Sequence, residues 1–477
     1  MLMTPNSTES GSWVDLLSGQ NLLMSIMLTA GVCINSINAY MSTTMLPSIA
    51  KDIGGIELYS WNTTLFMLAG ILSSALTGVV LQRCGARVSY MLAGSAFFTG
   101  SLIVAMAPSM TVMLFGRVLQ GVGGGMIFAL CYSMIMLVFS RQLWPRAMAL
   151  LSGVFGIGVL AGPAVGGVFA ELDVWRLGFG AFLPVTLVYL VAIARLLPEV
   201  DIQRKEDISI PLPQLLLIVV SVLSISISGT MTSTLWSVSG IVASVMCVLL
   251  LARCDKICSS RLFPKGTFQI GTTLSVAFCA MFLMIVCISS EIYLPYYLQV
   301  LYGQSPLIAG YMTASMAVGW TVSELVAARW TGSAMFRAIN TGPVLMVLGT
   351  GGLVALLPFY QSRDVSLSYG IGVCLILCGI GIGLGWPHIS TFVLKYTSSE
   401  DKANAGSAIT TVQMFAVAFG SALAGMIVNA TGINGPDGLD GIANSARWLF
   451  GVFSIIAMLA FFVVLRIPST LRGQDIQ

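Results

Sequence analysis

Four ionisable side chains lie inside long apolar runs of the sequence: Arg117, Glu291, Glu324 and His388. A charged side chain at the centre of a membrane-spanning helix costs about 2.5–3.5 kcal/mol on insertion scales, so such residues are expected to face a partner or a polar interior. Desolvation favours the neutral form of a carboxyl group, so either glutamate could take up and release a proton near neutral pH. A carboxylate that holds either a proton or a cationic compound, but not both, does the chemistry of an exchanger. We therefore predict a proton-coupling role for these four residues.

Each of these residues also has a purely structural interpretation. Glu324 lies toward one end of its run, where it could pair with Arg329 or meet water. Arg117 could bond to backbone carbonyls, and His388, which follows Pro387, could be a hydrogen-bonded packing residue. The sequence leaves both interpretations open.

Aromatic residues near these groups are candidates for a pocket that binds flat or cationic molecules through their ring faces. The candidate substrate-binding aromatics are Trp61, Phe66, Tyr293, Tyr296, Trp320 and Trp386. Most aromatic residues of membrane proteins instead pack in the interior or lie at the membrane interfaces. The aromatic set is therefore a hypothesis about the pocket.

The cysteines do not indicate a metal centre. Cys254 and Cys258 are four residues apart, but no nearby histidine or second cysteine pair completes a zinc set. The chain also lacks a phosphate-binding loop of the type that uses ATP. We expect no metal and no cofactor. In the topology given below, none of the ten cysteines lies in an outward-facing loop, so a disulfide framework is not expected.

The composition of the chain indicates which secondary-structure elements carry the candidate residues. The chain of 477 residues is 57% hydrophobic and 9% charged, whereas soluble domains carry about 25% charged residues. A transmembrane helix needs about 20 apolar residues. We predict an all-α, multi-pass membrane protein with fourteen spans, at residues 21–48, 57–81, 88–107, 111–138, 146–170, 176–197, 210–230, 234–252, 267–299, 305–329, 340–359, 366–394, 403–428 and 446–466.

Basic residues test this count, because cytoplasmic loops carry an excess of Lys and Arg. With both termini inside, most of the 22 basic residues fall on the inner side: Arg83, Arg87, Arg141, Arg146, Arg195, Arg204, Lys205, Arg253, Lys256, Arg261, Lys265, Arg329, Arg337, Lys395, Lys402, Arg466 and Arg472. The net charge of +3 therefore reflects membrane orientation and gives no sign of nucleic-acid binding. We expect the cell (inner) membrane as its location.

The layout predicts six helices, two extra helices and six more. The divisions are residues 1–200, a linker and extra-helix region at 201–265, and residues 266–477. The sequence GPAVGG at 162–167 in the fifth span has a counterpart, GSALAG at 420–425, in the thirteenth. Parallel repeats related by an axis along the membrane normal are typical of transporters.

The fifth span carries a stripe of small residues. Gly158, Gly162 and Gly166 recur every four residues, Gly167 adjoins them and Pro163 can bend the helix. Such a stripe lets another helix approach closely. The full pattern resembles the antiporter motif of the major facilitator superfamily.

Other segments extend this resemblance. LFGRVLQGVGGG at 114–125 resembles the embedded arginine motif of the family, and GVVLQRCGAR at 78–87 resembles its loop signature through Gly78, Arg83, Gly85 and Arg87. With fourteen spans, the chain is similar to the fourteen-helix drug:proton antiporters. Two departures stand out: Asn38 occupies the place of a first-helix aspartate, where we predict a polar substrate contact, and Gln82 replaces the aspartate of the loop.

The resemblance implies two six-helix bundles plus two extra helices, and export of small hydrophobic or cationic compounds against protons by alternating access. The expected partners are a small-molecule substrate, protons and the lipid bilayer, and we expect a monomer. One alternative is an exporter or importer of one metabolite or siderophore. Another is a transporter-fold protein without proton coupling, an alternative that Asn38 and Gln82 leave open. The spans contain no reactive constellation such as a metalloprotease motif or a nucleophile elbow, so we do not expect an enzyme.

Overall fold

A computed structural model describes residues 12–197, 210–231, 233–258, 260–362, 365–398, 401–433 and 435–467. Throughout these ranges the regular secondary structure is helical. The predicted division after residue 200, the charged segment 199–208, and Arg204, Lys205, Arg363 and Arg472 lie outside the described residues.

The helices follow the predicted apolar runs. In chain order they are α1 (Trp13–Leu16), α2 (Gly19–Ile53), η1 (Ile56–Leu58), α3 (Trp61–Ala105), α4 (Met110–Val138), α5 (Trp144–Glu171), α6 (Trp175–Gly180), α7 (Phe182–Leu196), α8 (Leu212–Ser228), α9 (Thr234–Ile257), α10 (Thr273–Ile288), η2 (Ser289–Tyr293), α11 (Leu294–Val300), α12 (Pro306–Ala327), α13 (Gly332–Leu356), η3 (Leu357–Ser362), α14 (Val365–Tyr396), α15 (Lys402–Ala430) and α16 (Gly438–Val464).

Eleven helices in the described ranges are long and apolar enough to cross a membrane. One of them, 56–105, covers two predicted runs, because α3 contains a break at Gly85. The φ of Gly85 is 80°, a conformation that favours glycine, so the chain can turn there between two helical segments. Two further predicted runs coincide with α8, which has 17 residues, and with α12.

The predicted run at 267–299 is not one uninterrupted helix. Its first helix, α10, begins at Thr273, where the Thr272 side chain accepts a hydrogen bond from the Ser275 N–H. A 3₁₀ turn, η2, then separates α10 from α11. Pro295 follows this turn at the start of α11, where a missing N–H costs nothing. The interruption places the polar residues Ser289, Ser290 and Glu291 between two helices.

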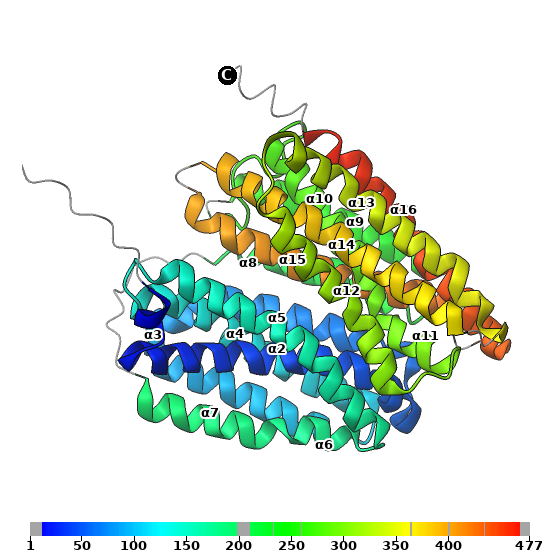
Figure 1. Ribbon diagram of the computed structural model, residues 1–477, viewed down its shortest axis with the longest axis horizontal. Helices are drawn as coiled ribbons and strands as arrows, with labels where there is room; N and C mark the ends of the chain where they lie inside the picture. The colour runs from blue at the N-terminus through cyan, green and yellow to red at the C-terminus, as the bar shows by residue number, and fades with distance from the viewer. Residues whose placement is uncertain are drawn as a thin grey trace, which may run out of the picture.

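The helices gather into two groups. In the first, α2 packs on α5, and α3 packs on α4 and α7; in the second, α14 packs on α12 and α13, and α10 packs on α15 and α16. Figure 1 shows the groups as a lower bundle, blue to green, and an upper bundle, green to red, which diverge at the left and meet at the right, near α11 and α12.

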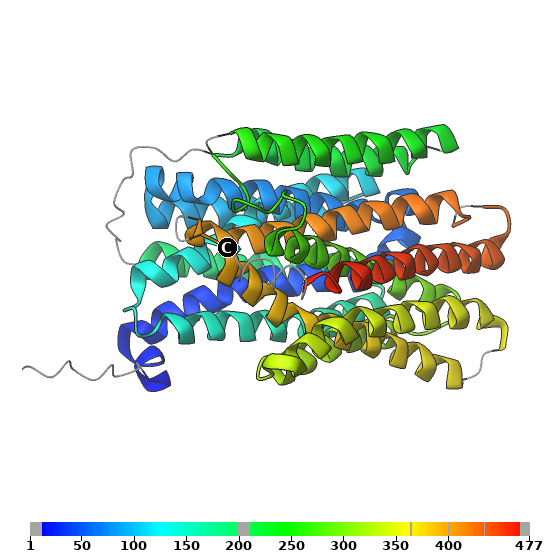
Figure 2. The same ribbon diagram turned by 90° about the horizontal axis from the view of Figure 1, so that it is seen from above.

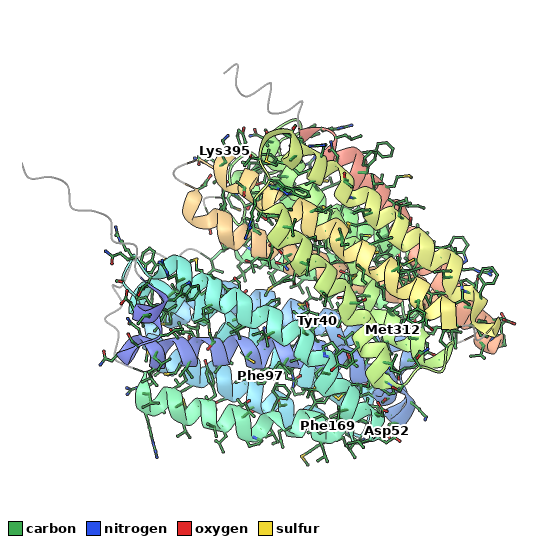
Figure 3. The ribbon with its side chains drawn as sticks, viewed as in Figure 1. Tyr40, Asp52, Phe97, Phe169, Met312 and Lys395 are labelled. Atoms are coloured by element: carbon green, nitrogen blue, oxygen red, sulfur yellow. The ribbon has the colours of Figure 1, made fainter. Side chains whose placement is uncertain are left out.

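The two ends of the molecule differ in charge. We call the end that carries Arg83, Arg87 and Lys395 the basic end, and the end where α11 meets α2 the gate end. Figure 3 shows Lys395 at the first and Asp52 at the second.

Helices α8 and α9 lie outside both groups. They pack on each other, and α8 also contacts α15 and α3. Figure 2 shows this green pair as an outermost layer. Leu235, Val242 and Leu249 of α9 are more than half exposed, as suits a helix that faces lipid.

Candidate functional site

The first polar centre is built around Arg117 on α4, whose side chain is only 1% exposed. Its Nη1 donates to Asn38 Oδ1 at 2.9 Å and to Gln120 Oε1 at 2.8 Å, and its Nε donates to the Asn62 carbonyl at 3.4 Å. The guanidinium also lies over the Phe66 ring, 4.2 Å from the centroid. The hydrogen bonds of Arg117 therefore link α4 to α2 and α3.

A second layer of neutral bonds supports this centre. Gln120 Nε2 donates to Ser101 Oγ at 3.0 Å, and Ser42 Oγ donates to Asn62 Oδ1 at 3.2 Å. Within the described part of the chain, no carboxylate lies within salt-bridge distance of Arg117. The Arg117 guanidinium thus donates its hydrogen bonds to neutral amide oxygens, and Asn38 is its partner on α2.

This placement bears on two predicted substrate contacts. Asn38 and Phe66 are buried against Arg117, at 0% and 5% exposure. Asn38 Oδ1 and the ring face of Phe66 are directed at Arg117, whereas Asn38 Nδ2 has no hydrogen-bond partner among the described residues. A role for them in binding a substrate remains a prediction.

The second polar centre is Glu291, which lies in the 3₁₀ turn η2 of the second group. Its carboxylate is partly buried and lies near enough to Tyr40 of α2 and Cys378 of α14 for electrostatic interaction. Figure 3 shows Tyr40 on the side of the first group that is turned toward the second. Glu291 is therefore an acid of the second group within electrostatic range of Tyr40 in the first group.

Tyr40 begins a row of aromatic rings that the sequence reasoning missed. Its centroid lies 6.5 Å from that of Phe155 on α5, Phe155 lies 6.0 Å from Phe128 on α4, and Phe128 lies 5.0 Å from Tyr132. We call these four residues the aromatic row. One signal was present in the sequence: Phe128 lies eleven residues after Arg117, which returns it to nearly the same face of α4.

Tyr293 and Tyr296 take part in a contact between the two groups at the gate end. Tyr59, just before α3, stacks on Tyr293 at 4.8 Å and meets Tyr296 edge-on at 5.8 Å. Asn429 of α15 donates to the Glu57 carbonyl at 2.8 Å and to the Gly229 carbonyl at 3.1 Å. We call Tyr59, Tyr293, Tyr296 and Asn429 the gate contact. Trp61 follows within the first turn of α3 and is partly buried.

The remaining candidates lie together between α12 and α14. The rings of Trp320 and Trp386 meet edge-on at 5.9 Å, and Glu324 lies one turn after Trp320 on α12. No ion pair joins Glu324 to Arg329 in the described residues. His388 is 5% exposed, and its Nε2 has no hydrogen-bond partner among the described residues. The structure thus groups Glu324 with the two tryptophans and keeps Glu291 with other neighbours.

The glycine stripe of α5 fits against α2. A Cβ built on Gly158 would meet Ser36, one on Gly162 would lie 2.6 Å from Tyr40 Cβ, and one on Gly166 would lie 2.6 Å from the Met41 carbonyl oxygen. Real Cβ atoms do not approach so closely, so only glycine permits this spacing.

The thirteenth predicted span repeats this arrangement. A Cβ on Gly420 of α15 would meet Ser289 after α10, as Gly162 of α5 meets α2. Gly167 abuts Leu307 of α12 in the second group, and Gly425 abuts Ser60, next to α3, in the first. Pro163 also contributes, because a Cβ on Gly310 of α12 would meet its carbonyl. Each glycine helix therefore also contacts the opposite group through one glycine: α5 contacts α12 through Gly167, and α15 contacts the residue before α3 through Gly425.

The loop signature lies at the basic end. Arg87 Nη2 donates to the Leu197 carbonyl at 2.8 Å, Arg83 is exposed, and nothing lies within 4 Å of the Cβ position of Gly78. Gly85 supplies the turn already described.

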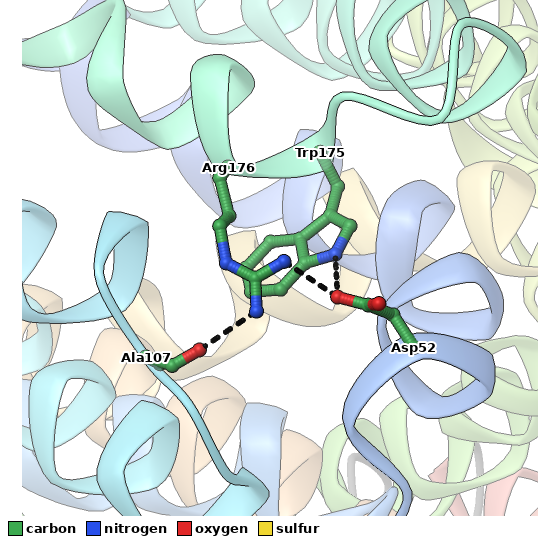
Figure 4. Close-up of polar contacts among 4 residues, drawn as sticks. All are labelled: Asp52, Ala107, Trp175 and Arg176. Carbon is green, nitrogen blue, oxygen red and sulfur yellow. Dashed lines mark hydrogen bonds and ion pairs between the residues drawn. The ribbon is translucent and has the colours of Figure 1, made fainter.

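An ion pair fixes the first group at the gate end. Arg176 Nη1 binds Asp52 Oδ2 at 2.5 Å, Trp175 Nε1 donates to the same oxygen at 3.1 Å, and Arg176 Nη2 donates to the Ala107 carbonyl at 3.0 Å (Figure 4). These bonds tie together the ends of α2, α3 and α6.

Comparisons with known proteins agree on one kind of molecule. The sequence profile described as Major Facilitator Superfamily matches residues 28–421. A probable multidrug-efflux transporter of Mycobacterium tuberculosis is 31% identical over 467 residues, covering 95% of this chain and 96% of its own. A putative multidrug resistance protein of Salmonella heidelberg, MdtD, is 25% identical and covers 93% and 94% of the two chains.

Solved structures share the fold. A D-xylose–proton symporter superposes with a TM-score of 0.66 at 14% identity, over 93% of this chain and 97% of its own. A POT family transporter crystallised with 5-aminolevulinic acid gives 0.67 at 12% identity, over 94% and 96%. At such identities the likeness concerns the fold alone.

Proposed function

The chain belongs to the major facilitator superfamily, and on that premise we propose that it exports small hydrophobic or cationic compounds in exchange for protons. Membership makes it a multi-pass membrane transporter and not an enzyme. The relatives at 25–31% identity are named as multidrug efflux or resistance proteins, which supports efflux as the direction.

The observation that carries this proposal is the position of Glu291. Glu291 lies at the helix break between α10 and α11, and its carboxylate is within electrostatic range of Tyr40, the first ring of the aromatic row. A flat cation lying on aromatic ring faces gains about 0.5–2 kcal/mol per favourable contact, and a carboxylate beside it balances the charge. In the proposed cycle Glu291 releases its proton to the inside, binds the cation, and exchanges the cation for a proton on the outside.

We further propose the membrane arrangement. All fourteen apolar runs span the cell membrane, both termini face the cytoplasm, and the basic end is the cytoplasmic end. The divisions at 1–200, 201–265 and 266–477 separate two six-helix bundles from the extra pair α8 and α9. The gate contact then closes the outer end, so the described conformation faces inward, and alternating access requires the gate contact to open.

The arginine centre has a structural task in this scheme. Arg117 is bound by Asn38, which does not titrate, so the first bundle holds its arginine without an acid. Proton exchange then depends on Glu291 and Glu324 of the second bundle, with His388 as a further relay candidate.

The same observation favours a second candidate function. Because the partner of Arg117 is an amide, a transporter of this fold without proton coupling also accommodates the arginine centre. The two functions differ in whether a pH gradient drives substrate flux.

The deciding experiment uses purified protein in liposomes. An inwardly directed proton gradient is imposed on vesicles in which substrate export is followed with a fluorescent organic cation. The proposal requires flux that rises with the gradient, together with proton movement when substrate is added. Substrate flux that ignores the gradient supports the uncoupled alternative.

A further inference from the structure

Two thiols meet at the end of α9. Cys254 Sγ and Cys258 Sγ lie 3.4 Å apart, and both side chains are partly exposed. Residues four apart share one face of a helix, and Cys258 lies just after the last turn, where its N–H still donates to the Cys254 carbonyl at 2.9 Å. The separation exceeds the roughly 2.05 Å of a disulfide, so both cysteines are free thiols.

The segment that carries these thiols is held in place. Asp255, which is 4% exposed, accepts the Leu262 N–H at 2.7 Å, and Gln214 of α8 donates to the Ser260 carbonyl at 2.8 Å. These two bonds fold the return loop against the start of α8. The thiol pair is therefore preorganised on a fixed helix end, which reduces the entropy lost when both sulfurs bind one atom.

The number of sulfur ligands limits which atoms the thiol pair can bind. A structural zinc ion requires four ligands, and no group of three or more His, Cys, Asp or Glu side chains suited to a metal occurs in the described residues. A soft centre that needs only two sulfurs fits the pair better, because thiolates prefer soft partners.

We propose that Cys254 and Cys258 form a chelating site for monosubstituted trivalent arsenicals at the basic end of α9. The reaction with an arsonous acid, R–As(OH)₂, forms two As–S bonds and breaks two As–O bonds. The two thiol protons leave with the hydroxyl groups as two waters, and arsenic stays trivalent. The site lies on the extra helix pair, and neither cysteine belongs to the proposed transport site.

The chain offers a matched control pair. Cys374 and Cys378 of α14 have the same spacing, but both are buried, and a Cβ on Gly349 would meet Cys378 Sγ at 2.5 Å. Burial and close packing therefore restrict the access of an arsenical to the second pair. Comparing the two cysteine pairs thus distinguishes the effect of solvent access from the effect of the four-residue spacing.

The test uses the purified full-length protein and phenylarsine oxide, which hydrates to phenylarsonous acid. Intact mass and thiol titration are expected to show one phenylarsine per chain and the loss of two titratable thiols. The adduct should resist a monothiol wash and be released by 2,3-dimercaptopropanol, because only a dithiol competes with a chelate.

Variants decide whether the assigned pair is responsible. Cys254→Ser and Cys258→Ser should each lose the monothiol-resistant adduct, while the Cys374→Ser/Cys378→Ser double variant should retain it. Size-exclusion profiles establish that each variant is folded. An adduct that survives in Cys254→Ser and Cys258→Ser, or wild-type protein that binds no monothiol-resistant phenylarsine, overturns the proposal.

Discussion

Replacing Arg117 by alanine tests the arginine centre most sharply. The substitution removes two charge-assisted bonds to the side chains of Asn38 and Gln120, each worth about 1.5–3 kcal/mol, and a desolvated ring contact with Phe66 worth about 2 kcal/mol. It also relieves the cost of holding a charge in the membrane, about 3 kcal/mol. The net expected loss in free energy of unfolding is about 2–5 kcal/mol.

Ser101→Ala is the matched control in the same network. It removes the neutral bond from Gln120 and the bond that Ser101 Oγ donates to the Phe97 carbonyl one turn earlier in α3. Interhelical bonds such as the one from Gln120 average about 0.6 kcal/mol in membranes. Arg117→Lys keeps the charge but lacks the planar fork, so it should be intermediate. Unfolding in detergent, followed by tryptophan fluorescence, measures all three variants.

Transport provides the second readout for this prediction. Arg117→Ala should reduce export more than Arg87→Ala, because Arg87 is exposed and makes one backbone contact, at Leu197. The reasoning is refuted if Arg117→Ala unfolds within about 0.5 kcal/mol of Ser101→Ala, a margin typical of harmless surface changes, and exports as well as Arg87→Ala.

Three further predictions follow from the contacts between helices. Gly162→Leu should abolish export while the protein still reaches the membrane, whereas Gly153→Leu should leave export intact, because nothing lies within 4 Å of a Cβ at Gly153; equal export by the two variants contradicts the close packing of α5 on α2. Asn429→Leu should increase the outward-open population, measured as labelling of an engineered gate-end cysteine, since it removes both carbonyl contacts; unchanged labelling contradicts the gate contact. Trp320→Phe should weaken binding of flat cations several-fold if the Trp320–Trp386 pair lines the site, as titrated by fluorescence, and unaltered affinity assigns the pair to packing.

The helices were largely predictable from the sequence because the bilayer imposes length and hydrophobicity on each span. The glycine stripe could also be interpreted in advance, since its four-residue spacing defines a helix face. The 3₁₀ turn η2 was not predicted, although Pro295 and the preceding polar residues were visible. Continuous hydropathy across 267–299 concealed the helix break in which Glu291 lies.

The neighbours of the candidate residues could not be predicted. Asn38 and Phe66 lie on helices that are apolar on several faces. Hydropathy does not indicate which of these faces contacts Arg117 and which contacts the other bundle. Tyr40 was overlooked for the same reason, because its importance depends on Glu291, some 250 residues away in sequence. Contacts between the two helix groups depend on tertiary packing, which a single sequence does not encode as a local pattern.

The central claim is that proton exchange depends on the acids of the second bundle. Glu291→Gln preserves size and polarity but removes the titratable group, and Glu324→Gln does the same beside Trp320. The direct measurement is substrate flux in liposomes under an imposed pH gradient, with each variant alone and combined. The account predicts that Glu291→Gln abolishes gradient-driven flux while some substrate binding remains, with a greater loss for cationic than for neutral compounds. A double variant that transports at the wild-type rate and still responds to the gradient contradicts the claim and directs attention to His388.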